Sequence, residues 1–138
     1  MIIAIRISGQ VGLTEEIKET LHRIKLRRKY SAVLLQETTE NTKLLKKIRN
    51  NISYGKISEE TLANLLARRA QPIDKNKKVD AKKVMSEIEK QPLEKLGLKP
   101  FFRLHPPRKG IESKKHAGVG KGVLGENEKI NELVEKML

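Results

Sequence analysis

The chain has 138 residues, of which 30 are lysine or arginine and 17 are aspartate or glutamate, so its formal net charge is +13. That length allows one compact domain with an extension. A charge of this size repels itself in the folded state, and a polyanion relieves the repulsion by releasing its condensed counterions. Nucleic acid is therefore the first candidate partner and an anionic membrane the second. Apolar runs such as Ala32–Leu35 are far shorter than the ~20 residues of a spanning helix, which disfavours the membrane.

The sequence contains no cysteine. This excludes disulfides, thiolate zinc sites and thiol nucleophiles, and it is typical of a cytosolic protein. The apolar start Met1–Ile5 lacks a basic leader and is followed at once by Arg6, so we expect no signal peptide.

The first half of the chain alternates between strand and helix patterns. Ile3, Ile5 and Ile7 occupy every second position, which predicts a half-buried strand over residues 2–8. The nearly all-apolar segment 31–36 predicts a central strand that is covered on both faces. Apolar spacing and the capping residues Thr14 and Ser58 predict the remaining elements, which are helices over 14–26, over 40–50 and from 58, and a strand over 52–57. This order predicts a small two-layer α/β or α+β domain with helices packed on one sheet.

The second half is more polar. Residues 71–79 have the composition of a linker, and residues 80–91 predict a short helix that Pro92 ends. Phe101–Leu104 predicts a further edge strand, and the basic, glycine-containing segment after it cannot build a core alone. The stripe of Ile130, Leu133, Val134 and Met137 predicts a terminal amphipathic helix.

Catalytic and metal sites find little support. The three histidines, His22, His105 and His116, have no metal-ligand spacing to one another or to carboxylates. The pairs Glu15–Glu16 and Glu59–Glu60 each follow a capping residue, so stabilisation of a helix N-terminus explains them better than acid–base catalysis.

A glycine-rich loop at Gly118–Gly122 hints at phosphate binding. It lacks the Walker spacing and the Ser/Thr after its lysine, and no clear strand precedes it. A flexible basic loop is the simpler interpretation. We therefore expect no catalytic residue, no metal and no cofactor.

Basic clusters recur along the chain, at Arg27–Lys29, at Lys43–Arg49, at Arg68–Arg69 and in the C-terminal segment. Each alone is typical of a solvated face, but together they favour nucleic-acid binding, mostly through phosphates. The four aromatic residues are Tyr30, Tyr54, Phe101 and Phe102, and we expect most of them in the core. This favours recognition of folded RNA by shape and charge over stacking on single strands.

Several stretches resemble one family of large-subunit ribosomal proteins, the family numbered thirty. The opening Ile2–Gly12, the run Thr20–Val33 and the core Leu44–Ile48 leading to Ile52–Gly55 carry the resemblance. Phe102–Gly110 and the closing Glu128–Leu133 are similar to the longer archaeal form, which is related to the eukaryotic protein numbered seven. The chain departs from the family at Gln36–Thr38, where a proline is frequent.

The resemblance implies a fold of the α+β class, with a ferredoxin-like two-layer strand-helix core, a basic C-terminal arm and a terminal amphipathic helix. It implies a structural role in the large subunit of the cytoplasmic ribosome, with 23S-type rRNA, close to 5S rRNA, and other large-subunit proteins as partners. No membrane or small-molecule substrate is implied. The RNA-binding residues that we expect are Arg6, Gln10, Arg27, Arg28, Lys29, Arg103, His105, Arg108, Lys109, Lys114 and Lys115.

On this interpretation the chain divides into an RNA-binding core (1–70), a linker with an inserted helix (71–98), the basic arm (99–125) and a C-terminal helix packing on the core (126–138). Two alternatives stay open: a free-standing regulatory RNA- or DNA-binding module, which would read bases from a recognition helix, and a small enzyme acting on anionic substrates.

Overall fold

A computed structural model describes residues 1–7, 13–69, 84, 87–88, 98–99, 101–108, 113–116, 122–127 and 129–138, with the backbone alone described for 113–116 and 122–123. In its first half, strands and helices alternate as the sequence predicts. The elements are β1 (Ile2–Arg6), α1 (Glu15–Arg23), β2 (Ser31–Leu35), α2 (Thr39–Lys47), β3 (Ile52–Lys56) and α3 (Glu59–Arg69). The second half contributes β4 (Phe102–Arg103), β5 (Ser113–His116), β6 (Gly122–Glu126) and α5 (Ile130–Met137). The expected linker 71–79 and most of the expected helix 80–91 lie outside the described residues.

The helices begin where capping side chains satisfy free backbone donors. The Thr14 hydroxyl accepts from the Ile17 amide at 3.4 Å, and the Ser58 hydroxyl accepts from the Thr61 amide at 3.3 Å. Thr38 caps α2 in the same way, accepting from the Asn41 amide at 3.2 Å. The caps predicted at Thr14 and Ser58 are therefore confirmed.

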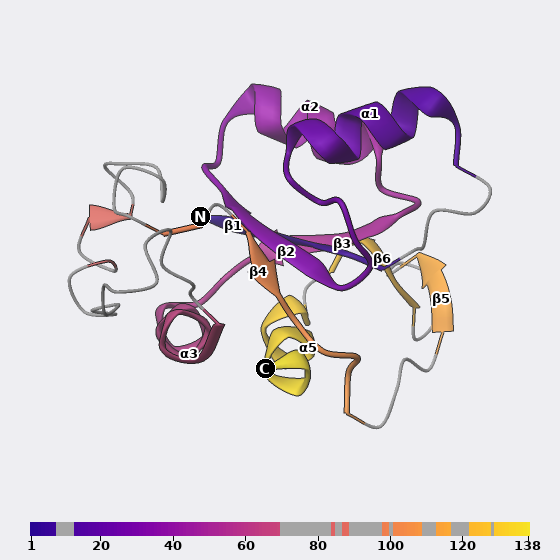
Figure 1. Cartoon of the computed structure of the whole chain (residues 1–138). Coiled ribbons are helices and arrows are strands. Elements are labelled where there is room, and N and C mark those ends of the chain that lie inside the picture. The colour runs from indigo at the N-terminus through magenta and orange to yellow at the C-terminus, as the bar shows by residue number, and fades with distance from the viewer. Residues whose placement is uncertain are drawn as a thin grey trace.

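The strands form one six-stranded sheet in the order β4-β2-β1-β3-β6-β5. The central strand β1 is antiparallel to both of its neighbours, with Ala4 opposite Val33 on one side and Tyr54 on the other. The chain reaches β2 and β3 through α1 and α2, and both helices lie on the same face of the sheet (Figure 1). This strand-helix arrangement confirms the α+β class and the ferredoxin-like core.

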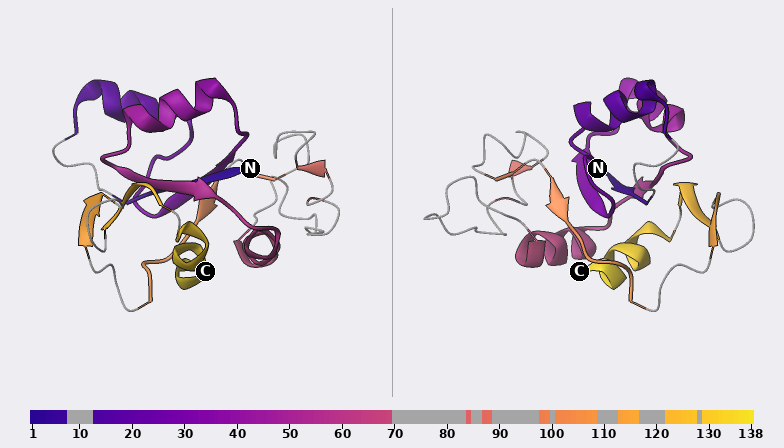
Figure 2. Two further views of the ribbon diagram at one scale, coloured as in Figure 1. Left: turned by 180° about the vertical axis from the view of Figure 1, so that it is seen from behind. Right: turned by 45° about the vertical axis from the view of Figure 1, so that its right-hand side comes forward.

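The opposite face of the sheet is covered as well. Helices α3 and α5 lie there, and the two further views in Figure 2 agree on this arrangement. Ile3, Ile5 and Ile7 pack in the core on the α3 and α5 side, whereas Ile2 and Ala4 pack in the core beneath α1 and α2. Strand β1 was predicted to be half-buried, and that prediction is wrong: all five of its residues are buried, because helices cover both faces.

Segments from the second half of the chain extend the sheet on both sides. Strand β4 pairs with β2, with Arg103 opposite Ser31, as the predicted edge strand requires. Strand β6 pairs in parallel with β3, with Gly125 opposite Ser53. The composition of 113–126 gave no strand signal, and β6 forms because an edge of the core sheet was available to it.

Asn127 joins β6 to α5 and to β3. Its amide donates to the Tyr54 carbonyl at 2.8 Å, and its side-chain Nδ2 donates to the Ser53 hydroxyl at 3.2 Å. Gly55 permits the close approach, since a Cβ there would lie 2.6 Å from the Asn127 carbonyl oxygen and 2.9 Å from Cγ2 of Ile130. The C-terminal helix is thus seated directly against β3.

Candidate nucleic-acid interface

The basic loop after α1 begins at a tight helix ending. The Lys25 amide donates to the His22 carbonyl at 3.1 Å, and the Leu26 amide donates to the Leu21 carbonyl at 2.8 Å. This pair of bonds is a Schellman motif, in which the first residue after the helix end adopts a left-handed conformation. That residue is Lys25, with φ 68°, and the accompanying apolar contact comes from Leu21 and Leu26, which are both buried in the core beneath α1 and α2.

The same loop ends at a second left-handed residue, Tyr30, with φ 66°. The Tyr30 amide donates to the Arg6 carbonyl at 2.7 Å, and its carbonyl accepts from the Leu104 amide at 3.1 Å. The loop from Lys25 to Tyr30, called the basic loop below, is therefore fixed at both ends. Left-handed backbone is costly for residues with a Cβ and is concentrated at functional sites. These two residues therefore indicate that the basic loop is part of a functional site.

Four cationic side chains of the basic loop project into solvent. Lys25, Arg27, Arg28 and Lys29 are all exposed. The Lys29 ammonium lies 5.0 Å from the centroid of the Tyr30 ring, within the range of a cation–π interaction. The loop was predicted as an RNA-facing cluster, and the structure places it on an accessible surface.

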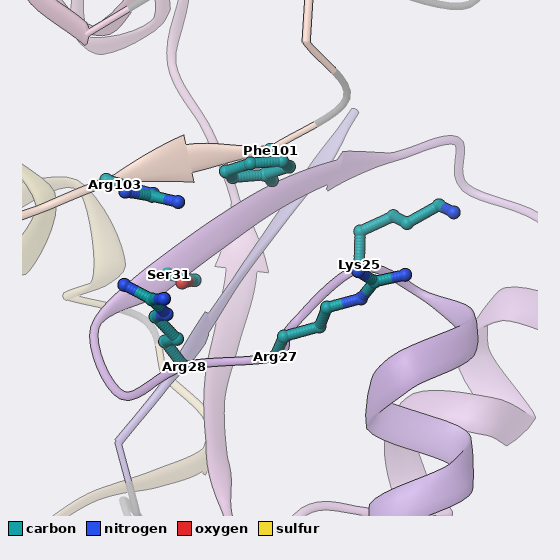
Figure 3. A pocket seen from close by; sticks show the side chains of 6 residues that line it. All are labelled: Lys25, Arg27, Arg28, Ser31, Phe101 and Arg103. Carbon is teal, nitrogen blue, oxygen red and sulfur yellow. The ribbon is translucent and has the colours of Figure 1, made fainter.

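A pocket of about 280 Å³ lies between the basic loop and β4. Six residues line it, as Figure 3 shows: Lys25, Arg27, Arg28, Ser31, Phe101 and Arg103. Phe101 is half-buried against the core beneath α1 and α2, so its ring is held in place. The guanidinium carbon of Arg103 lies 5.7 Å from the centroid of that ring. Two predicted RNA contacts from the loop thus meet one from β4 around an aromatic residue.

The cations of this pocket are not compensated by carboxylates of the part of the chain that the structure describes. No carboxylate among the described residues lies within ion-pair distance of Lys25, Arg27, Arg28 or Arg103. Other cations do have such partners, for example Lys47, which meets Glu16 at 2.5 Å between α2 and α1. Four like charges around one hollow repel one another, and an anion placed there relieves that repulsion.

Arg6 requires a correction. It was expected to face RNA, but its side chain is only 2% exposed and lies on the α1 and α2 face of β1. Its Nη1 donates to the Leu26 carbonyl at 2.9 Å, and burial lowers the pKa of its guanidinium from the ordinary value. Arginine remains charged even so. Arg6 therefore holds the start of the basic loop and is out of reach of a macromolecule.

The segment after β4 is fixed to the C-terminal helix. The His105 amide donates to the Met137 carbonyl at 3.1 Å, and the Arg108 amide donates to the Lys136 carbonyl at 3.0 Å. The two ring nitrogens of His105 face the backbone oxygens of Pro106 and Leu138. His105 is therefore engaged with the end of α5, whereas the side chain of Arg108 is exposed.

The remaining predicted contacts are less fully placed. Gln10 and Lys109 lie outside the described residues. Lys114 and Lys115 belong to β5, the strand at the far edge of the sheet from β4, where the structure describes the backbone. The structure thus brings Arg27, Arg28 and Arg103 together and does not bring the β5 lysines to the same edge of the sheet.

Sequence reasoning missed Lys25, Ser31 and Phe101 as lining residues. A signal for Phe101 was present, because Phe101 and Arg103 are two positions apart and share one face of an extended segment, while Phe102 takes the other. Phe102 is indeed buried, as is Tyr54, which confirms that part of the aromatic prediction. Lys25 had no such signal, because its place depends on how α1 ends.

Among the described helices, none has the length and apolarity needed to cross a membrane. A family model described as "Ribosomal protein L30p/L7e" matches residues 2–52. The chain is 37% identical to the large ribosomal subunit protein uL30 of Methanosphaera stadtmanae, over the whole of both chains. It is 33% identical to the protein of the same name from Archaeoglobus fulgidus, over 99% of each chain, and 35% identical to that of Nanoarchaeum equitans, over 94% of this chain and 93% of the other.

Proposed function

The chain belongs to the L30p/L7e family of ribosomal proteins, and from that premise we propose how it acts. It is a structural protein of the large subunit of the cytoplasmic ribosome, with rRNA and neighbouring ribosomal proteins as partners. Its particular task is to bind and stabilise folded rRNA of the 23S type, near the place where 5S rRNA docks. It does so without catalysing a reaction.

The single observation that carries this proposal is the group of cations around the pocket, none of which has an ion-pair partner among the described residues. Lys25, Arg27 and Arg28 come from one short loop that is fixed at both ends, and Arg103 faces them from β4. Because the loop is held in advance, little conformational entropy is lost when phosphates bind to it. Contacts of this kind position the protein on RNA and are strongly salt-dependent.

The proposal extends to basic residues elsewhere. Lys29 and Arg108 are exposed and close in sequence to the pocket residues, and we include both as phosphate contacts. Gln10 and Lys109 stay in the proposal on the strength of the family resemblance, and Lys114 and Lys115 stay in it as basic residues of the arm. Arg6 and His105 leave it, because the Arg6 side chain donates to the Leu26 carbonyl and the His105 ring faces the backbone oxygen of Leu138.

A salt titration tests the mechanism. Binding of the full chain to fragments of large-subunit rRNA is measured between 50 and 200 mM salt, for the wild type and for the double variant Arg27→Gln/Arg28→Gln. The wild type should lose affinity steeply, and the double variant should bind more weakly with a slope smaller by about two units. Arg68→Gln, on α3 across the sheet, removes a charge elsewhere and is the matched control. Binding that is indifferent to salt would contradict the mechanism.

Sedimentation tests the cellular role. After a high-salt wash, the chain should remain with the large subunit in a sucrose gradient of a native extract. A pool at the top of the gradient would instead favour the free-standing regulatory module. Proximity to 5S rRNA is tested separately, by photocrosslinking from position 28 in purified large subunits. The crosslinked nucleotides are expected to lie in 23S-type rRNA, in the region where 5S rRNA docks.

A further inference from the structure

The pocket beside the basic loop has a feature that phosphate binding does not require. An aromatic ring, that of Phe101, forms part of the wall of a hollow that is otherwise lined by cations and one serine. Contact with the outside of an RNA helix needs only charge and donors on a convex or flat surface. A cationic hollow with an aromatic wall is suited to a ligand in which a flat, uncharged ring is joined to a negatively charged group.

We propose that this pocket takes a single unstacked nucleotide extruded from folded RNA. Its base lies against the Phe101 ring, and its phosphate lies among Arg27, Arg28 and Lys25. The inference rests on the proposed function and makes it more specific, because it assigns to this protein the recognition of an irregularity in the RNA as well as the neutralisation of its backbone.

The geometry supports the assignment of the base to Phe101. The ring is half-buried and packs against the core beneath α1 and α2, so it is a rigid platform. Every base has a π face, so stacking on such a platform does not depend on sequence. Arg103 lies beside the same ring, with its guanidinium carbon 5.7 Å from the centroid. Its planar guanidinium therefore adds a second flat surface, a charged one, next to the base.

The geometry also supports the assignment of the phosphate to the basic loop. Arg27 and Arg28 are exposed, and neither has an ion-pair partner among the described side chains. Lys25, in its left-handed conformation at the helix ending, lines the same hollow. All three cations line this one pocket, and charged donors of this kind bind a phosphate more strongly than they bind an uncharged group.

The size of the hollow limits the ligand. At about 280 Å³ it lies just below the range of small-molecule sites, which span roughly 300–1,000 Å³. One nucleotide suits this volume better than a stacked pair of bases. Extrusion of an unpaired base costs less than extrusion of a paired one, so a bulge or an internal loop is the expected source.

The test compares two RNA hairpins of equal stem length, one with a single bulged adenosine and one fully paired, by fluorescence anisotropy with the full chain at 0.15 M salt. The wild type should bind the bulged hairpin about tenfold more tightly, the order expected for one stacked base. Phe101→Leu should remove this preference and leave binding to the paired hairpin within about twofold. Arg27→Gln should weaken binding to both hairpins and lower the salt slope by about one unit.

Two controls separate a lost site from a damaged protein. An abasic nucleotide at the bulge keeps the phosphate and removes the base, so it should abolish the preference of the unaltered wild-type chain. Arg68→Gln should preserve the preference. Competition with free adenosine monophosphate separates the two sources of a nucleotide: if it displaces the bulged hairpin at concentrations comparable to the hairpin's own affinity, the commitment to an extruded RNA nucleotide is overturned.

Other outcomes decide between this inference and the proposed function. One such outcome is that the bulged, abasic and paired hairpins all bind equally, while the salt slope and the co-sedimentation with the large subunit stay normal. That result would reject the nucleotide pocket and leave the ribosomal role intact. Absence of binding to all three hairpins and to rRNA fragments would overturn both. Tighter binding of a glutamate-rich peptide than of the bulged hairpin would mark the pocket as a protein-binding site and also overturn the inference.

Discussion

Arg6 Nη1 donates to the Leu26 carbonyl oxygen at 2.9 Å, and this bond ties the central strand β1 to the first turn of the basic loop. The guanidinium is almost completely buried. Arg6→Leu leaves the Leu26 carbonyl without this donor, and an unsatisfied buried acceptor costs about 1–3 kcal/mol. Thermal unfolding should therefore shift down by roughly 5–10 °C.

The same variant separates a structural role from RNA contact. Below its own unfolding temperature, Arg6→Leu should bind rRNA fragments with the salt slope of the wild type, since its charge does not face RNA. A slope reduced by a full unit at unchanged stability would show that Arg6 reaches phosphate after all. Arg28→Gln, at an exposed position, should do the reverse, lowering the slope and leaving the melting temperature nearly unchanged.

Lys25 is left-handed, at φ 68°, where a Cβ costs about 1–2 kcal/mol. Lys25→Gly removes that cost but adds entropy to the unfolded chain, so a net gain of about 0.5–1 kcal/mol is expected. The melting temperature should rise by a few degrees while affinity for rRNA falls, because one pocket cation is lost. Lys29→Gly is the matched control: its φ lies outside the left-handed region, and it should give no gain. An unchanged or lower melting temperature for Lys25→Gly would contradict the strain argument.

Gly55 lies where α5 meets β3. A Cβ there would lie 2.6 Å from the Asn127 carbonyl oxygen, which is backbone and cannot simply rotate away. Gly55→Ala should therefore cost about 1–3 kcal/mol in chemical denaturation, as overpacking does. Lys56→Ala alters the next, exposed position of β3 and should be nearly neutral. If Gly55→Ala were as stable as the wild type, α5 would have to sit farther from β3 than the structure places it.

Glu16 and Lys47 connect α1 to α2 at 2.5 Å. The hydrogen bond from Lys47, with its charge, lowers the pKa of the Glu16 carboxyl below its ordinary value of 4.5. A carboxyl with a depressed folded-state pKa stabilises the fold above its unfolded pKa, and the stabilisation is lost as the pH falls through the folded value. The stability difference between wild type and Glu16→Gln should thus be largest near neutral pH and vanish in acid. Urea denaturation from pH 7 to pH 3 measures it, and added salt should shrink it.

How much of the fold can be predicted from the sequence depends on how local the cause is. Helix caps and apolar spacing act within one or two turns, and the helices that they predict are present. Examples are the caps at Thr14 and Ser58 and the spacing of Leu62, Leu65 and Leu66. The second covering of β1 is not local. Ile3, Ile5 and Ile7 indicate one apolar face, which α3 and α5 cover, but only the packing of α1 and α2 on Ile2 and Ala4 shows that the other face of the strand is covered as well.

The candidate site divides in the same way. Arg27 and Arg28 are visible as a run of cations, and Arg103 by its place in an expected strand. Arg6 has the same composition signal as these residues and a different fate, because its position on a fully covered strand turns it inward. Charge alone does not distinguish an arginine that meets a ligand from one that holds a loop, whereas strand position and the covering helices do.

The order of the strands has a consequence for the chain while it is being made. Strands β2 and β3 flank β1, yet the segments that cover their outer edges, β4 and β6, are synthesised more than thirty residues after α3. A nascent chain that has emerged through Arg69 therefore presents two open strand edges and an isoleucine-rich face that α5 will later cover. Open edges of this kind pair with other chains. Newly made copies are for that reason most prone to aggregation before the last third of the protein has left the tunnel.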